Sequence, residues 1–443
     1  MNMPPPVVSP ATRARPGSSP SASVPTISSP SRARRVVSGW FAGTPGSLRL
    51  RGAISVFMCV LFGVVAFSGA LALDRNVDGQ RSDAAQLVRV ESIRTNLVKA
   101  DANATNAFLV GGLEPADARA AYTAGISAAA RVLAESAGAN GGDAPVLRRV
   151  NEVVTTYTGL IESARANNRQ GFPVGAAYLR QASKVMQQQA LPALDSLVTG
   201  ARNRVDDASR SAALPIVIIV TLLALATLLI VQVWIYRRTH RVFNVALVAA
   251  TALVLIMGAA TIGGMSWSQS AAKKVRVGAF ARTVALATAR SDGFDAKSAE
   301  ALTLVNRGSG QGYEDRFVSV SGAARVALDT GVAAVTTDPA ATRARTAFDQ
   351  YLIDHAEVRK LDIGGEWEKA VAYATGGGTA NRSFGAFELA SGRAIVHQSL
   401  LVSDDLETAR WPLVPLAWLA LLAGLAAAGL AGSGLNPRLR EYR

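Results

Sequence analysis

Four long apolar runs separate the polar stretches of the chain. They cover about residues 53–73, 212–236, 242–266 and 412–432, and none of them contains Asp, Glu, Lys or Arg. As a helix, each run is long enough to cross the ~30 Å hydrocarbon core of a bilayer. The pattern therefore predicts four transmembrane helices.

The two long stretches between these runs repeat with the period of an α-helix. Apolar or small residues recur every three or four positions from Val90 to Ala107 and again from Phe280 to Val305. This spacing is typical of the seam of a helix in a bundle, and no strand-like alternating run of comparable length competes with it. The expected fold class is all-α, with two tandem four-helix bundles carried by four transmembrane helices.

Breaks rich in Gly and Pro divide the outer stretches into helices. We expect helices in the first stretch at about residues 74–110, 115–137, 144–168 and 173–211, and equivalent breaks in the second near 307–312, 336–339, 362–365 and 376–378. The first and last helices of each bundle are expected to continue out of a span. Up-down-up-down order then puts two loops of each bundle at its far tip. These loops are residues 110–115, 168–174, 306–313 and 362–368.

Weak sequence similarity links the two outer stretches. Residues 94–96 match residues 290–292 at an offset of 196, and further identities occur at an offset of 194. The residues matched at 194 are Tyr157, Arg165, Gly171 and Ala176 with Tyr351, Arg359, Gly365 and Ala370. A few identities can arise by chance, but together with the shared plan they favour an internal duplication.

Arginine is concentrated in three short pieces of the chain. Residues 1–52, 237–241 and 433–443 hold thirteen Arg and a single acidic residue, Glu441. By the positive-inside rule these pieces, with both termini, are cytoplasmic, and residues 74–211 and 267–411 are extracellular. Orientation in the plasma membrane thus explains most of the net charge of +14. Because the excess has this explanation, we do not expect nucleic-acid binding.

The N-terminal piece is rich in Pro, Ser and Arg and poor in large apolar residues. Residues 1–52 are therefore expected to be a disordered cytoplasmic tail. A docking or phosphorylation segment around Ser38 is the alternative. The first apolar run is longer than the apolar region of a signal peptide, so we expect a retained membrane anchor.

The chain lacks the motifs of catalysis and transport. Its three His have no ligand spacing, and its one Cys, Cys59, lies in the first apolar run. Phosphate-binding loops, metalloprotease and serine-hydrolase motifs are absent, and no span carries a charge for an ion path. We therefore expect no enzyme, no metal site and no cofactor. Ala420, Gly424, Ala428 and Gly432 recur every four residues, which favours close helix packing in lipid.

With catalysis and transport not indicated, the sequence favours binding of a ligand or a partner by the extracellular stretches. Arg94 and Arg290, at matching points of the two stretches, are candidates to bind a small carboxylate, although each could also be a solvated surface Arg. The tip loops mix aromatic and adaptable polar residues, as protein interfaces do, although ordinary helix-hairpin chemistry would give a similar mixture. The partner-binding candidates are Asn168, Arg169, Phe172, Tyr178, Tyr313, Asp362 and Trp367. For cytoplasmic output, the candidates in the turn between spans two and three are Arg237, Arg238 and Arg241.

Two resemblances follow from these observations. The span–bundle–span plan of each half is similar to the outer module of bacterial chemoreceptors. Three sequence segments resemble the GlnX family of actinobacterial four-span membrane proteins. They are ANATNAFLVGGLEP at 102–115, RANNRQGFPVGAAYLRQAS at 165–183 and DAKSAEALTLV at 295–305. The second resemblance implies a tandem extracellular sensor working between a solute-binding lipoprotein outside and a soluble Ser/Thr kinase inside.

The expected function is that of a plasma-membrane sensor and signal transducer. It would sense extracellular amino-acid availability through a solute-binding lipoprotein and pass a conformational signal to a cytoplasmic partner such as a Ser/Thr kinase. About 68 cytoplasmic residues are too few for a kinase domain, so output needs a partner. The alternatives are a receptor that binds a small ligand directly and a structural envelope protein.

Overall fold

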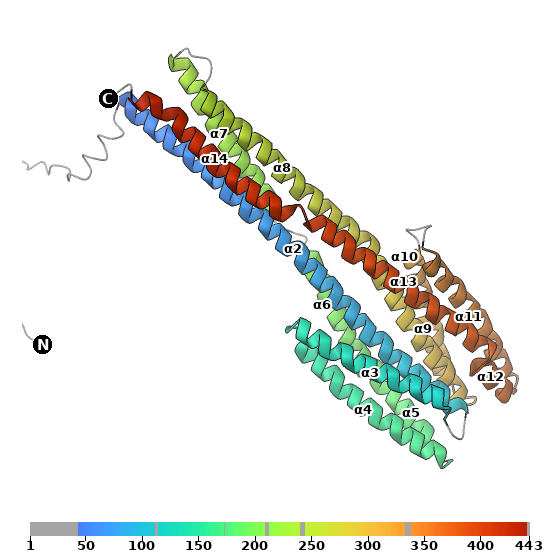
Figure 1. Ribbon diagram of the computed structural model, residues 1–443. Coiled ribbons are helices and arrows are strands. Elements are labelled where there is room, and N and C mark those ends of the chain that lie inside the picture. The colour runs from blue at the N-terminus through green and yellow to red at the C-terminus, as the bar shows by residue number, and fades with distance from the viewer. Residues whose placement is uncertain are drawn as a thin grey trace, which may run out of the picture.

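The computed structural model confirms the all-α fold. It describes residues 43–110, 114–171, 173–208, 212–239, 244–332 and 338–440, and these residues contain helices and no strand. The helices form an elongated molecule, with a shaft at one end and a wider head at the other (Figure 1). The predicted tail falls mostly on residues 1–42, outside the described residues. For residues 43–52 the prediction of disorder is wrong, because these residues form the first turns of a helix.

The longest element is α2 (Gly43–Val110), a helix of 68 residues. It contains the first apolar run and continues without a break into the first outer stretch, as predicted. At 1.5 Å per residue it is ~100 Å long. One rigid element thus connects the shaft with the tip of the head (Figure 1).

Bundle one consists of the outer half of α2 and the helices up to residue 208. These helices are α3 (Ala116–Ala139), α4 (Ala144–Arg169), α5 (Val174–Val185), the π-helical turn η1 (Met186–Ala190) and α6 (Leu191–Ala208). The breaks lie where the sequence predicts them. The last helix contains the π turn directly before Pro192, which has no N–H for the regular α-helical bond.

Bundle two consists of α9 to α13 and follows a similar plan. Its helices are α9 (Ala281–Val305), α10 (Gln311–Val332), α11 (Pro339–Ile363), α12 (Trp367–Ala374) and α13 (Thr379–Arg410). The third span, α8 (Val245–Val275), runs into α9 through the π turn η2 (Arg276–Phe280). Gly171 and Gly365, which match at an offset of 194, have φ angles of +74° and +82° in equivalent loops. This shared left-handed geometry supports the duplication.

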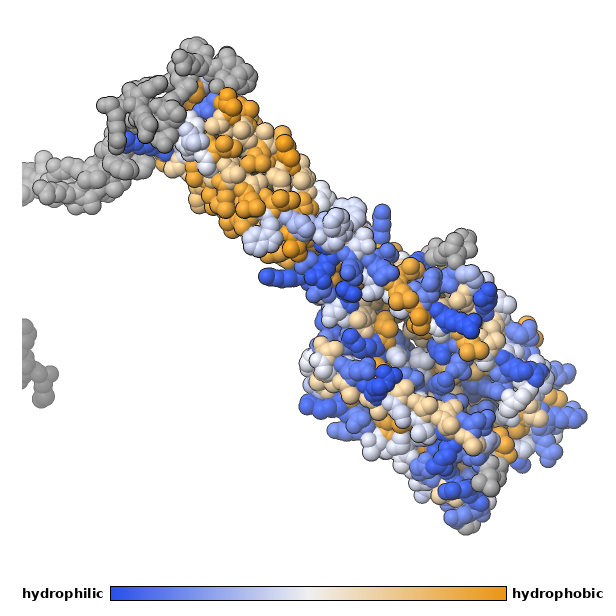
Figure 2. Space-filling model, viewed as in Figure 1, coloured by the Kyte–Doolittle hydropathy of each residue, from blue (hydrophilic) through white to orange (hydrophobic). Residues whose placement is uncertain are grey.

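Four helices are long and apolar enough to cross a membrane. Besides α2 and α8 they are α7 (Ala213–Thr239) and α14 (Leu413–Arg440). Together they form a shaft with an apolar band on its surface, whereas the head is largely polar (Figure 2). The prediction that the last helix of bundle two continues out of its span is wrong. The chain turns at Trp411–Pro412, because Pro412 cannot donate the helical hydrogen bond.

The two bundles are docked against each other along α2 and α9 (Figure 1). Every residue from Gly293 to Leu304 in α9 is buried, so this helix is covered on all sides. One continuous hydrophobic cluster includes residues of both bundles and of the spans. The outer part of the chain is therefore a single packed unit.

The spans α2 and α14 approach most closely at two glycines. A Cβ on Gly424 would lie 2.5 Å from the Gly63 Cα and 2.8 Å from the Cys59 carbonyl oxygen. Gly429, one turn further along α14, has nothing within 4 Å of such an atom. The four-residue ladder of small residues predicted around Gly424 thus includes a true backbone contact.

Gly424→Val should force α2 and α14 apart. We expect a loss of ~1–3 kcal/mol in stability, as for overpacked cores, measured as a lower melting temperature of the purified protein. Gly429→Val has the same helix propensity change and should melt like wild type. Equal melting temperatures for the two variants would contradict the close contact.

Candidate functional site

The predicted tip loops lie together at the end of the head farthest from the shaft (Figure 1). They connect α2 with α3, α4 with α5, α9 with α10, and α11 with α12. Residues 111–113 and Phe172, which belong to two of these loops, lie outside the described residues. The tip therefore combines loops from both bundles on one surface.

Several predicted partner-binding residues have contacts within the head. The Trp367 indole donates a hydrogen bond of 2.9 Å to the Leu304 carbonyl, and the Arg307 guanidinium lies 3.8 Å from the centre of its ring. Tyr178 and Tyr313 are half-buried against the core, and Asp362 pairs with Arg359. These contacts fix the shape of the tip, and a role of the same residues in partner binding stays a prediction.

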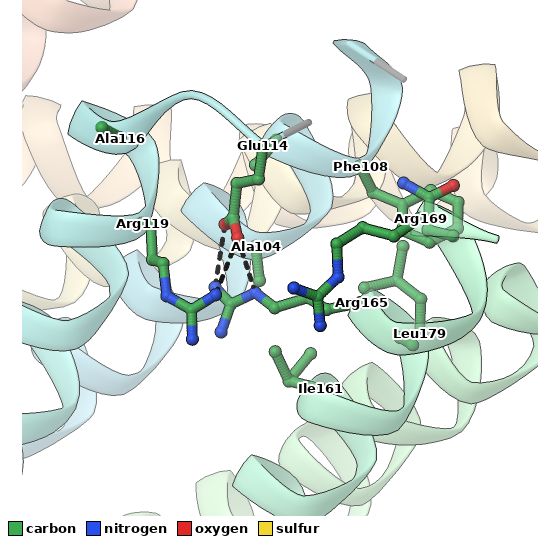
Figure 3. A pocket seen from close by; sticks show the side chains of 12 residues that line it. Ala104, Phe108, Glu114, Ala116, Arg119, Ile161, Arg165, Arg169 and Leu179 are labelled. Carbon is green, nitrogen blue, oxygen red and sulfur yellow. Dashed lines mark hydrogen bonds and ion pairs between the residues drawn. The ribbon is translucent and has the colours of Figure 1, made fainter. Parts of the chain in front are cut away.

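Asn168 and Arg169 line a cavity of about 230 Å³ at the distal end of bundle one. The cavity lies between α2, α3, α4 and α5, and Figure 3 shows the arginines around it. Its apolar wall includes Phe108, Ile161 and Leu179. We call this space the distal pocket.

The polar side of the distal pocket is built around Glu114. The Arg165 Nε lies 2.9 Å from a Glu114 carboxylate oxygen, and an Arg119 nitrogen lies 4.0 Å from it (Figure 3). The Arg165 guanidinium also stacks 4.2 Å from the centre of the Tyr122 ring. Burial raises the pKa of Tyr122 to about 12, so this phenol is neutral.

The ligand candidates Arg94 and Arg290 lie at the interface between the bundles. Arg94 is 3.3 Å from both Asp195 of α6 and Asp292 of α9. Arg290 donates to the Ser391 hydroxyl at 2.9 Å and to the Glu388 backbone carbonyl. Both guanidinium groups thus already have protein partners, and carboxylate binding by them stays a prediction.

A second cavity, of about 320 Å³, lies beside this interface. It is lined from both bundles, by residues of α2 such as Glu91 and Lys99 and by Arg290 of α9. Glu91 is 1% exposed, and neither of its carboxylate oxygens has a hydrogen bond among the described residues. Burial raises the pKa of Glu91 to about 7, although Arg94 opposes the shift. Burial likewise raises the pKa of Asp292 to about 6.

These two raised pKa values predict that the head is more stable at acid pH. The charged groups facing Glu91 are Arg94 on α2, Asp195 and Arg202 on α6, and Asp292 on α9. A carboxyl whose pKa is raised in the folded state favours folding when protonated. Their contribution to stability should therefore grow as the pH falls from about 7 towards 4.5, and should be lost as the pH rises through 7.

Melting of the full-length protein between pH 5 and 8 measures this effect. Glu91→Gln should reduce the slope of stability against pH, by at most ~1.4 kcal/mol per pH unit. Glu152→Gln, on the exposed face of α4, should keep the wild-type slope. If the two variants have the same slope, Glu91 does not carry the pH dependence.

Sequence reasoning missed Glu91, Glu114 and Arg119 altogether. It used Arg165 only as one of the residues matched in the duplication, although this match with Arg359 could have pointed to the pocket. Arg165 and Arg359 align at an offset of 194, and each pairs with a Glu at the start of the preceding bundle helix, Glu114 just before α3 at 2.9 Å and Glu314 in the first turn of α10 at 3.1 Å. A repeated ion pair of this kind marks the position of the distal pocket.

Fold and site together define the class of the protein. Four apolar helices carry a polar head that contains the distal pocket and the cavity beside the bundle interface, an arrangement that suits a membrane sensor. A family model described as the actinobacterial sensor domain matches residues 76–210, the part of the chain that forms bundle one. No curated protein and no solved structure matches the chain. These findings indicate a membrane sensor of an actinobacterium.

Proposed function

We propose that this protein senses extracellular amino-acid availability through a solute-binding lipoprotein that docks on the tip of the head. It then passes a conformational signal across the plasma membrane to a cytoplasmic partner such as a Ser/Thr kinase, and is not itself an enzyme. The sensor-domain match in bundle one supports the sensing role. The sequence resemblance to GlnX proteins supports the two partners.

The continuity of α2 carries this proposal. The helix has a partner-accessible tip at one end and a membrane span at the other, without a break in 68 residues. Its outer half packs against α3 and α9, and its inner half packs against α14. A displacement of the tip is therefore transmitted directly into the spans, where no flexible linker can absorb it.

The second route into the membrane is the α8–η2–α9 run of bundle two. Since α2 and α9 pack against each other, the two routes form one two-state element. A docked lipoprotein shifts the equilibrium between the two states only by the difference between its binding free energies for them. Arg237 and Arg238 in the last turn of α7 face the cytoplasm in this proposal. The third output candidate, Arg241, lies outside the described residues.

Thiol labelling of intact cells tests the orientation. In a Cys59→Ser background, Asn140→Cys and Ser309→Cys should react with an impermeant reagent, and Ser21→Cys should react only after lysis. Ser309 is exposed, whereas the neighbouring Gly310 is buried and has no room for a side chain. Labelling at position 21 in intact cells would reverse the proposed topology.

Capture of partners from native membranes tests the function. Tagged wild-type protein should retain a solute-binding lipoprotein, and Trp367→Ala should weaken this capture by more than ~1 kcal/mol, as expected for an aromatic anchor. The matched control is Trp411→Ala, since Trp411 is exposed at the opposite end of the head. Equal capture by both variants would place the interface away from the tip. Absence of any lipoprotein would refute the partner and favour a directly liganded receptor.

A further inference from the structure

We infer that the distal pocket of bundle one binds a small organic carboxylate. This goes beyond the proposed function, because the ligand would contact the sensor itself without a lipoprotein. The inference rests on the charges, the shape and the duplication of the pocket.

The pocket has more positive than negative groups. Three guanidinium groups, of Arg119, Arg165 and Arg169, line it together with one carboxylate, that of Glu114. Glu162, whose side chain is half-exposed, contacts Arg165 at 2.6 Å and Arg119 at 3.5 Å from outside the pocket lining. Among the described residues, the Arg169 guanidinium has neither an ion pair nor a hydrogen bond. It extends towards Arg165 (Figure 3) and is available to an anion.

The start of α3 adds to this preference for anions. Ala116, the first residue of α3, lines the pocket, and the preceding Pro115 provides no side-chain cap. The first N–H groups of a helix and the positive end of its dipole both favour a negative group nearby. The same anion could thus be bound by guanidinium and backbone donors.

The opposite wall of the pocket selects an organic ligand. Ile161 and Leu179 are each 1% exposed, and with Phe108 they form an apolar surface. The volume of about 230 Å³ is below the ~300–1,000 Å³ of pockets for drug-sized ligands. A carboxylate with a short aliphatic body satisfies both walls, whereas inorganic phosphate leaves the apolar one bare.

The equivalent positions of bundle two differ from the distal pocket in two residues. Arg359 pairs with Glu314 as Arg165 pairs with Glu114. However, the position of Ile161 is occupied by His355, whose ring stacks 3.4 Å from Phe317 and bonds to Glu314. The position of Arg169 is Ile363. Bundle one therefore has an aliphatic side chain where bundle two has an imidazole, and in Arg169 a guanidinium that is unpaired among the described residues.

Binding to the full-length protein in lipid nanodiscs, without any partner, tests the inference. The probes are butyrate and succinate, with inorganic phosphate and butylamine for comparison. We expect a carboxylate to raise the melting temperature and to bind measurably by calorimetry. Arg169→Gln should weaken this binding about tenfold, the effect of one charge-assisted hydrogen-bonding group. Arg169 is exposed and has no partner among the residues that the structure describes, so the variant should fold normally.

The matched control is Arg149→Gln, an exposed residue of the same helix, roughly 30 Å away along α4. It should bind the probes like wild type. The inference is overturned if neither carboxylate stabilises the protein, if phosphate or butylamine does so equally, or if both variants lose affinity alike. Because no lipoprotein is present in this experiment, such a result would not contradict the proposed docking of a lipoprotein on the tip. Conversely, failure to capture a lipoprotein from membranes would not contradict carboxylate binding in the distal pocket.

Discussion

Glu300→Ala should destabilise bundle two by ~3–5 kcal/mol, because it leaves a buried ammonium group without its carboxylate. Glu300 is 1% exposed and lies 2.6 Å from the Lys297 Nζ and 2.7 Å from the His355 Nδ1. Burial alone would raise the pKa of Glu300, but Lys297 and His355 hold it at about 2. Without Glu300, the Lys297 ammonium keeps its hydrogen bond to the Ala374 carbonyl, at 2.8 Å, and the rings of Tyr351 and Phe384 at 5.5 and 5.9 Å, but among the described residues it has no carboxylate partner.

Chemical unfolding of the purified protein measures the loss. Glu357→Ala removes an exposed Glu–Lys pair on α11 and should cost less than ~1 kcal/mol. Replacing both partners, as Lys297→Met with Glu300→Leu, should recover much of the loss, since an apolar pair needs no charge compensation. If Glu300→Ala unfolds at the same denaturant concentration as Glu357→Ala, the buried pair does not stabilise the head.

Asp101→Ala is expected to loosen the two bundles from each other. This buried carboxylate of α2 accepts hydrogen bonds from Tyr157 at 3.2 Å and Ser183 at 2.8 Å in bundle one, and from Ser298 at 2.6 Å in bundle two. Burial raises its pKa, and the bonds from the two serines oppose that shift. The substitution removes the shared acceptor and should cost ~2–3 kcal/mol, because three buried hydroxyls lose their partner.

A double-mutant cycle separates the interface from the bundle. Asp101→Ala and Ser298→Ala should show a coupling free energy of ~1 kcal/mol, which belongs to the contact between bundles. Asp101→Asn keeps one acceptor oxygen and should be intermediate in stability. Additive effects of Asp101→Ala and Ser298→Ala would show that the hydrogen bond does not hold the bundles together.

The helices and their breaks were predictable because they depend on local signals. Hydrophobic periodicity found the seam of α2 that includes Val90, Ile93 and Leu97, and Gly and Pro placed the loops within a few residues. The turn at Pro412 was not foreseen, because the apolar run after it suggested an uninterrupted helix. Local chemistry therefore explains both the successes and this error.

The docking of the bundles was not predictable in the same way. A second seam runs along α2 through the buried residues Glu91, Val98, Asp101 and Thr105 and the half-buried Arg94, at the same three-and-four spacing. Because most of these residues are polar, a hydrophobic pattern does not reveal them. Their burial depends on partners such as Asp292 and Ser298, about 200 positions away in the sequence.

The candidate ligand residues show the same limit. Their matching positions make Arg94 and Arg290 candidates, but Arg94 pairs with Asp292 across the bundle interface and Arg290 lines the cavity beside it. The arginines of the distal pocket come from α3 and α4, and the convergence of Arg119 and Arg165 on Glu114 depends on how these helices pack. Only the three-dimensional arrangement distinguishes a paired Arg from an available one.

Cross-linking between α2 and α9 tests most directly that the two bundles are docked as one packed unit, on which the proposed signalling depends. The pair Arg94→Cys and Asp292→Cys replaces side chains that lie 3.3 Å apart, in a Cys59→Ser background. The control pair is Thr156→Cys and Thr346→Cys, exposed on the outer helices α4 and α11. Membranes are treated with a short bismaleimide and then cleaved at a protease site inserted between α7 and α8. The account predicts that the 94/292 pair keeps the two halves together on a denaturing gel and the 156/346 pair does not. Halves that separate equally in both cases would show that the bundles are independent.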